Sequence, residues 1–507
     1  MDLKEVIKFE GLSDYKNILK ISIVLIFLLM IIDSKNIINH IFALVNIVAI
    51  SYIFKDNKEK YFYLVTFLFA IMSFTISIPL GKELNSEQID IYYIFLFIYI
   101  AKMFYDYFIS FIRNKKIANR VTLEKIIFIL FIIWVIVSFF IADNKIIAFK
   151  KLILYCIMMS FVIMIVNENK TKRELNITLK FLSIISIGIV VMGTLEIATD
   201  LCIQPKTSYI MANLDFSRLE FLRRVPTVFF YNPNNYGFVI SLILLGFVAK
   251  VYFSRSKKDI IINLIVIILA QINLIFTRSR TAWVTVIGAI VFILIFFMVT
   301  LEKKLILKCF LSLFLILGIF LGLSKIPQLG PYYGKMRELS IPSVESNKNT
   351  PASEVKDESA DNIELGGTGS VNVRATLIVD VVEGVFKEKN YFGFGLGNTT
   401  EYYRKLNNTG GIVDAHNWWV EVLGDFGIVG FSLFLVFYVI LFIKKAILFK
   451  KSKEDKKYYI LGMVLIVSTA VLVFGPSSVY AFIPFWLVNS LAISITSIYD
   501  DKYLERI

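Results

Sequence analysis

Apolar stretches of one characteristic length recur from one end of the sequence to the other. Each runs for roughly 17 to 25 residues, long enough to cross a hydrocarbon core ~30 Å thick. Inside lipid the backbone must satisfy its own hydrogen bonds, so such stretches form helices. Composition agrees, because 57% of the residues are hydrophobic and only 19% are charged, against about a quarter charged in soluble domains. The sequence therefore predicts an all-α, polytopic helical membrane protein.

We expect about fourteen transmembrane helices from the lengths of these stretches. A half-length or re-entrant segment among the first six would reduce that number to twelve or thirteen. The predicted spans are residues 17–32, 37–54, 61–80, 91–112, 125–142, 150–166, 177–198, 236–253, 260–277, 282–301, 306–323, 419–443, 459–475 and 479–498.

The connecting loops alternate between cationic and cation-poor sequences. Segments such as "RNKKIANR" and "KKSKEDKK" alternate with short loops such as "DSKN". Cytoplasmic loops of membrane proteins accumulate Lys and Arg, so we expect the cationic loops and both termini in the cytoplasm. The same bias explains the net charge of +14 without a nucleic-acid partner.

Two predicted outside loops are long, and the second precedes the last three spans. They cover residues 199–235 and 324–418. Residues 342–370 are rich in Ser, Asn, Glu and Gly, which predicts a flexible insertion. Helical periodicity returns over 373–386, so we expect a short amphipathic helix outside the membrane. The predicted organisation is N-terminal helices in 1–175, a core in 176–475, and a last helix with a cytoplasmic tail in 476–507.

Several arginines fall on the predicted outside face, where the positive-inside rule disfavours them. Arg278 and Arg280 lie in the turn "FTRSRTAW", Arg223 and Arg224 precede "VPTVFFYNPNN", and Arg374 lies in the second long loop. Arginine forks bind phosphate oxygens bidentately and keep their charge. The alternative is interfacial snorkelling or a salt bridge to a loop carboxylate. Gathered at one depth, these arginines indicate a phosphate or diphosphate ligand.

His416 is one of only two histidines and lies in "DAHNWWVEVLGDFGIVG". A structural or interfacial histidine is one interpretation, and we give it to the other histidine, His40. However, His416 shares the outside face with the arginines, and Asp414 or Glu421 could orient its ring. Histidine also takes a proton readily near neutral pH. His416 is therefore the candidate general base, and two histidines with few clustered acids predict no metal site and no cofactor.

The segment "GFGLGN" could suggest a phosphate-binding loop. It lacks the Lys-Ser/Thr of such a loop and has no strand–turn–helix context. We expect instead a tight turn that brings the backbone close to a neighbour or a ligand.

Together these motifs resemble the O-antigen ligases and the related O-antigen or capsular polysaccharide polymerases of bacterial membranes. His416-Asn417, nine residues, Gly427, two residues and Gly430 match the histidine motif H-[NSQ]-x(9)-G-x-x-[GTY]. "TRSRTAW" is similar to the family's S-R-[GT]-A turn, which makes Arg280 the motif arginine and Arg278 an extra one. "YNPNN" is similar to its N-P-N signature, and "VNVRATLIVD…NYFGFGLGN" to its R-x(n)-G-x-G-x-G-N stretch. The arginine upstream of N-P-N is doubled, so Arg223 and Arg224 both stay candidates.

The resemblance implies a metal-independent, inverting glycosyltransferase on the outer face of the bacterial cytoplasmic membrane. Its donor would be a glycan on undecaprenyl diphosphate. Arg280, one of Arg223 and Arg224, and Arg374 would hold the diphosphate, with His416 as general base and Asn417 in support. Positioning and charge neutralisation would supply most of the catalysis.

The acceptor stays open between two possibilities. A polymerase transfers the glycan to the next lipid-linked repeat unit, and a ligase transfers it to lipid A–core. A polysaccharide flippase and a chain-length regulator are possible protein partners. The competing interpretation is a flippase without transferase activity, which would carry charges deep in its spans.

Overall fold

The protein is described by a computed structural model that places residues 15–33, 36–73, 75–79, 88–112, 122–199, 224–333, 365–367 and 370–504. The chain forms two compact units. The first unit takes Met1–Arg120, Met159–Ser279 and Trp486–Ile507. The second unit takes Val121–Met158 and Arg280–Phe485.

The first unit is helical apart from two short strands. Its elements are α2 (Tyr15–Ile32), α3 (Ile37–Ile53), η2 (Lys58–Lys60), α4 (Tyr61–Ile71), β1 (Ser77–Pro79), β2 (Gln88–Asp90), α5 (Ile91–Ile112), α8 (Lys172–Thr199), α9 (Pro233–Phe253) and α10 (Lys257–Phe276). Two helices continue from one unit into the other: α7 (Lys145–Glu168) and α18 (Ile483–Leu504).

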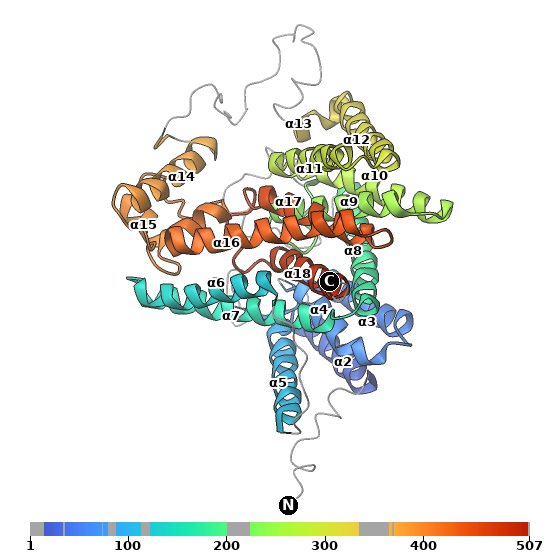
Figure 1. Ribbon diagram of the computed structural model, residues 1–507, viewed down its shortest axis with the longest axis horizontal. Helices are drawn as coiled ribbons and strands as arrows, with labels where there is room; N and C mark the ends of the chain where they lie inside the picture. Colours follow the sequence, from blue (N-terminus) through green and yellow to red (C-terminus); the bar gives the residue numbers. More distant parts are fainter. Residues whose placement is uncertain are drawn as a thin grey trace, which may run out of the picture. The chain divides into compact units, whose positions relative to one another are not determined.

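The second unit is built around one long helix, α16. Its elements are α6 (Leu123–Ile141), α11 (Arg280–Val299), α12 (Lys303–Ser324), η4 (Pro327–Leu329), α13 (Gly330–Tyr333), α14 (Ser370–Phe386), α15 (Thr399–Leu406), α16 (Trp418–Lys451) and α17 (Lys456–Leu472). Helix α16 packs along α6 and α17, and α11 packs between α12 and α17. Helices α14 and α15 lie at the end where α16 begins (Figure 1).

The predicted polytopic all-α membrane fold is confirmed. Every predicted span contains a helix, and ten helices among the described residues are long and apolar enough to cross a membrane. Two further apolar helices, Ile37–Ile53 and Ile483–Ile498, are shorter. The number fourteen is therefore not confirmed.

The span predicted at residues 61–80 is wrong in its second half. Helix α4 ends at Ile71, and β1 then pairs antiparallel with β2, with Ser77 opposite Asp90. The reason lies in the sequence "SFTISIP", where polar and apolar residues alternate with a period of two. That period suits a strand and gives a helix no continuous apolar face.

The helix predicted after the long insertion is confirmed as α14. Its buried face repeats every four residues, at Val373, Leu377, Val381 and Val385. This stripe packs against apolar residues of the neighbouring α15 and α16, including Tyr403. The predicted flexible insertion, residues 342–370, lies outside the described residues except for 365–367 and Ser370.

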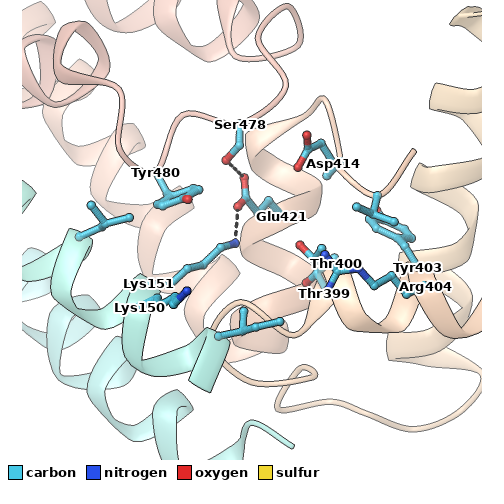
Figure 2. Close-up of a pocket in the computed structure, with 14 residues that line it drawn as sticks. Lys150, Lys151, Thr399, Thr400, Tyr403, Arg404, Asp414, Glu421, Ser478 and Tyr480 are labelled. Atoms are coloured by element: carbon cyan, nitrogen blue, oxygen red, sulfur yellow. Dashed lines mark hydrogen bonds and ion pairs between the residues drawn. The ribbon is translucent and has the colours of Figure 1, made fainter. Parts of the chain in front are cut away.

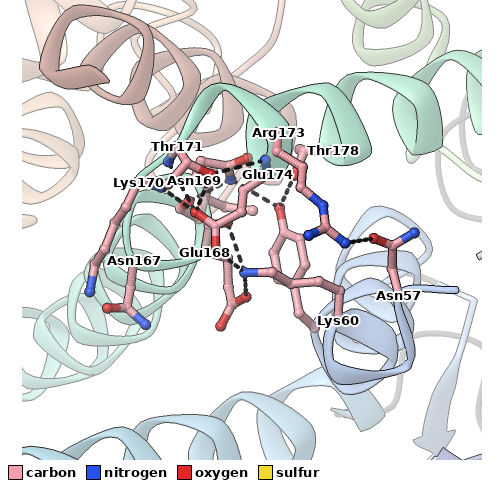
Figure 3. Close-up of polar contacts among 12 residues, drawn as sticks. Asn57, Lys60, Asn167, Glu168, Asn169, Lys170, Thr171, Arg173, Glu174 and Thr178 are labelled. Atoms are coloured by element: carbon pink, nitrogen blue, oxygen red, sulfur yellow. Dashed lines mark hydrogen bonds and ion pairs between the residues drawn. The ribbon is translucent and has the colours of Figure 1, made fainter. Parts of the chain in front are cut away.

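An ion-pair network joins the start of α4 to the α7–α8 turn in the first unit (Figure 3). The ammonium of Lys60 lies 2.7 Å from carboxylate oxygens of both Glu168 and Glu174. Arg173 Nη2 donates to Asn57 Oδ1 across 3.1 Å. Two further cationic loops, "KDNKEK" and "NENKTKR", therefore lie at the same end of this unit, which agrees with the expectation that the cationic loops share one side of the membrane.

Candidate functional site

The turn between α17 and α18, residues 473–482, anchors the segment that carries His416. The backbone N–H of His416 donates to the carbonyl of Ser477 at 3.0 Å. Two residues later, the N–H of Trp418 donates to the carbonyl of Val473 at 3.3 Å. We call residues 473–482 the α17–α18 turn. It holds both sides of His416, just before α16 begins.

Arg374 and the start of α11 meet the same turn. Arg374 Nη1 lies 3.5 Å from the carbonyl oxygen of Phe474. A Cβ atom built on Gly475 would lie 3.8 Å from Cβ of Thr281, the second residue of α11. Arg280 is the first residue of α11 and its side chain is exposed. Three predicted site residues, Arg280, Arg374 and His416, are thus carried by segments that converge on one turn.

The environment of His416 favours its neutral form. Its backbone φ is +50°, a left-handed conformation that is uncommon outside glycine. Nδ1 is buried and has no hydrogen-bond partner among the described residues. Burial is the main effect that lowers the pKa of His416 below its ordinary 6.5, and the charge of Arg374 lowers it further, while Asp414 acts in the opposite direction. The ring is therefore available to accept a proton at neutral pH.

The residues beside His416 have distinct roles in the structure. Asn417 caps α16, since its side-chain oxygen accepts from the N–H of Trp419 at 3.0 Å. Asp414 is exposed. We expected that Glu421 could orient the histidine, but its two carboxylate oxygens accept from Lys151 at 2.8 Å and from Ser478 at 2.5 Å.

Sequence reasoning missed a buried charge cluster on this side of α16. Lys151 of α7 lies 2.8 Å from Glu421 and 3.4 Å from Asp425. Its ammonium also lies 4.6 Å from the centre of the Tyr480 ring. The signal was present: Glu421 and Asp425 are four residues apart in an apolar helix, so they share a face and require a cation.

The glycine-rich turn packs directly on α16, as the predicted tight turn required. Gly393 adopts φ +83°, and a Cβ there would lie 2.5 Å from the backbone nitrogen of Gly427. Gly427 breaks the helical backbone of α16 with φ +62° and ψ −162°. Asp425 accepts from the N–H of Gly397 at 2.8 Å and from the hydroxyl of Thr399 at 2.6 Å. The glycines of two sequence motifs are therefore in contact with each other.

A cavity of about 280 Å³ opens beside this cluster (Figure 2). Its wall includes Lys150 and Lys151 of α7, residues of α15 and of the α17–α18 turn, and the two residues before His416. The lining is mixed. Its polar members are Lys150, Lys151, Thr399, Thr400, Tyr403, Arg404, Asp414, Glu421, Ser478 and Tyr480.

The other predicted arginines are assigned to the first unit, although Arg278 lies only two residues before Arg280 in the chain. Arg224 and Arg278 are exposed residues of the first unit, and Arg223 lies outside the described residues. Their roles stay predictions from the resemblance.

The "NPN" sequence begins α9. The side chain of Asn232 accepts from the N–H of Asn235 at 2.9 Å, and Pro233 follows it at the first helical position. Glu196, which sequence reasoning also missed, accepts from the N–H groups of Thr227 and Val228 at 2.9 and 2.7 Å. These contacts fix the segment between Arg224 and α9.

Residues 264–435 match the O-antigen ligase family. The match begins within α10, ends within α16, and includes Arg280, Arg374 and His416. The resemblance predicted from the motifs is confirmed. No protein of curated function matches the sequence. The chain is a multi-pass membrane protein with an O-antigen ligase-like segment, which supports a ligase- or polymerase-like role in making surface polysaccharide.

Proposed function

We propose that this protein transfers a glycan from undecaprenyl diphosphate to an acceptor hydroxyl, at the outer face of the bacterial cytoplasmic membrane. The observation that carries the proposal is the convergence on the α17–α18 turn. His416, Arg374 and the start of α11 with Arg280 come from three separate motifs, and each meets this turn. Such a transfer requires a base near cations that hold the diphosphate, and the three chain segments that carry these candidate residues adjoin this turn.

The reaction is a single displacement with inversion. Neutral His416 accepts the proton of the acceptor hydroxyl while the oxygen attacks the anomeric carbon of the donor sugar. The bond from that carbon to the diphosphate oxygen breaks, and the electron pair leaves with the diphosphate. Arg280 and Arg374 stabilise the developing charge as preorganised donors. The base contributes ~10² to 10⁴-fold to the rate.

The lowered pKa of His416 supports this role. A base must be unprotonated when the substrate arrives, and burial together with Arg374 disfavours the imidazolium form. The left-handed backbone at His416 supports it too, because such conformations are held against strain most often at functional sites.

The experiment supplies purified protein in liposomes with lipid-linked repeat units and no nucleotide. Longer lipid-linked chains identify a polymerase. Product that forms only after lipid A–core is added identifies a ligase. Movement of the lipid across the bilayer with no transferred product under either condition refutes the transferase and favours a flippase.

A further inference from the structure

We propose that the cavity between α7, α15 and the α17–α18 turn binds a sugar ring of the acceptor glycan, beside the hydroxyl that reacts at His416. This inference rests on the proposed transferase function. It adds a binding site for the acceptor sugar, a ligand that the roles proposed for His416 and the arginines do not cover.

The cavity and His416 share two chain segments. Asp414 and Ala415 line the cavity and directly precede His416. Ser478 lines it from the other side and directly follows Ser477, whose carbonyl holds the N–H of His416. A ligand in the cavity is therefore bound beside the segment that positions the candidate base.

The lining suits a sugar better than a diphosphate. The wall carries two carboxylates, Asp414 and Glu421, and three cations, Lys150, Lys151 and Arg404. Two of these cations are already paired, Lys151 with Glu421 and Asp425 and Arg404 with Glu401. Carboxylates repel a diphosphate at short range but accept hydrogen bonds from sugar hydroxyls. Lys150 and Arg404 supply donors to the same hydroxyls.

The volume of the cavity also suits a sugar ring. The cavity holds about 280 Å³, slightly below the ~300 Å³ at which pockets for drug-sized ligands begin. A sugar ring fits this space, whereas a long lipid chain does not. Two aromatic side chains, Tyr403 and Tyr480, line the cavity, and Tyr480 is the more exposed of the two, although the Lys151 ammonium and the Tyr155 ring already contact it.

The walls are held in place before any ligand arrives. Lys151 and Ser478 both bind Glu421, which joins α7, α16 and the α17–α18 turn, as Figure 2 shows. Asp425 binds the hydroxyl and the N–H of Thr399 at 2.6 and 3.1 Å, which fixes the start of α15. A cavity with fixed walls loses little conformational entropy on binding.

The first test is protection of a cysteine placed in the cavity. Thr400→Cys, which lines it, and Lys405→Cys, which does not, are made after Cys156, Cys202 and Cys309 are changed to Ser. Each variant is labelled with a small maleimide in the presence of the repeat-unit oligosaccharide released from the producing cells' surface polysaccharide. We expect labelling of Thr400→Cys to slow several-fold and that of Lys405→Cys to stay unchanged. Equal labelling with and without the oligosaccharide overturns the proposal, as does protection by undecaprenyl diphosphate alone.

The second test compares two adjacent cations on α15. Arg404 lines the cavity and Lys405 does not. Each pairs with a carboxylate, Arg404 with Glu401 and Lys405 with Asp143. With the donor fixed, Arg404→Ala should raise the KM for the acceptor by ~10-fold, the effect of one charge-assisted hydrogen bond. The kcat and the KM for the donor should stay near the wild-type values, and Lys405→Ala should change none of the three.

The two proposals fail in different ways. If the wild-type protein transfers glycan but Arg404→Ala and Lys405→Ala have the same KM for the acceptor, the cavity proposal is wrong and the transferase stands. If no transfer occurs with any acceptor, the proposed function fails. The protection experiment then tests the cavity proposal independently, because it measures binding of the oligosaccharide and does not require transfer.

Discussion

The backbone N–H of His416 donates a hydrogen bond to the carbonyl oxygen of Ser477, 3.0 Å away. This bond fixes a left-handed residue at the entrance to α16 through its main chain and leaves the imidazole free for chemistry. A suitable replacement at position 416 should therefore remove the imidazole and its activity while the backbone keeps its conformation.

His416→Asn is the sharpest form of that replacement. Asparagine tolerates the left-handed conformation better than most residues, so the anchor to Ser477 should persist. We expect normal levels of protein in the membrane and a transfer rate lower by ~10² to 10⁴-fold, the usual contribution of a general base. Measured turnover close to wild type would remove His416 from the base role.

The pH dependence of transfer should move in opposite directions with two substitutions. Activity needs neutral His416, so the rate falls as the pH drops through the lowered pKa of this residue, below 6.5. Arg374 lowers that pKa, so Arg374→Gln should move the acidic limb of the kcat/KM profile to higher pH. Asp414 raises it, so Asp414→Asn should move the limb to lower pH. Limbs that coincide in all three proteins would show that another group controls the profile.

Arg280→Lys tests the geometry of the diphosphate site rather than its charge. The substitution keeps one positive charge at the start of α11 but replaces a planar fork with a point donor. We expect a rise in the KM for the donor and a fall in kcat, with unchanged thermal stability because Arg280 is exposed. Lys304→Arg, a change between the same two residue types at the start of α12, serves as the control and should be silent. Wild-type kinetics in Arg280→Lys would exclude a bidentate role.

Sequence alone predicted the parts of this molecule that depend on local pattern. Apolar length and helical period located the helices, including α14, because both signals lie within one segment. The prediction was wrong in the second half of 61–80. The sequence there stays rich in apolar residues but loses the helical period, and the chain forms β1. Apolar length is a weaker guide than period when β-branched and polar residues alternate.

Within the site, the sequence predicted only those residues whose type alone is informative, such as a rare histidine or an arginine in an outside loop. His416 and the arginines stood out because they were rare or misplaced by charge rules. Lys151 did not, since its partners Glu421 and Asp425 lie far along the chain and only packing brings them together. The α17–α18 turn was missed for the same reason: it contributes backbone carbonyls, which every residue has.

Lys151→Met should be strongly destabilising because it leaves Glu421 and Asp425 buried without a cation. Removal of one partner from a buried pair typically costs ~3–5 kcal/mol. The double variant Lys151→Met/Glu421→Gln removes one of the stranded charges and should recover part of that loss, a non-additivity that marks direct coupling. Thermal unfolding in detergent measures both effects. Additive losses in the double variant would contradict the pairing.

Gly427→Ala should disrupt the packing of the glycine-rich turn against α16. Gly427 has φ +62° and ψ −162°, a region that side chains avoid, and an added Cβ would lie 2.2 Å from the carbonyl oxygen of Tyr391. The backbone strain alone costs ~1–3 kcal/mol, and the displaced carbonyl would also lose its hydrogen bond from the N–H of Ile428, now 2.9 Å long.

Gly288→Ala is the matched control for this change, because an added Cβ in α11 meets no atom within 4 Å. We expect Gly427→Ala to lower the Tm and to reduce transfer, since the same turn holds Thr399 against Asp425 beside the cavity. Gly288→Ala should leave both unchanged or raise the Tm slightly, as alanine suits a helix interior better than glycine. Equal Tm values for the two variants would show that the break in α16 is not required for the turn to pack.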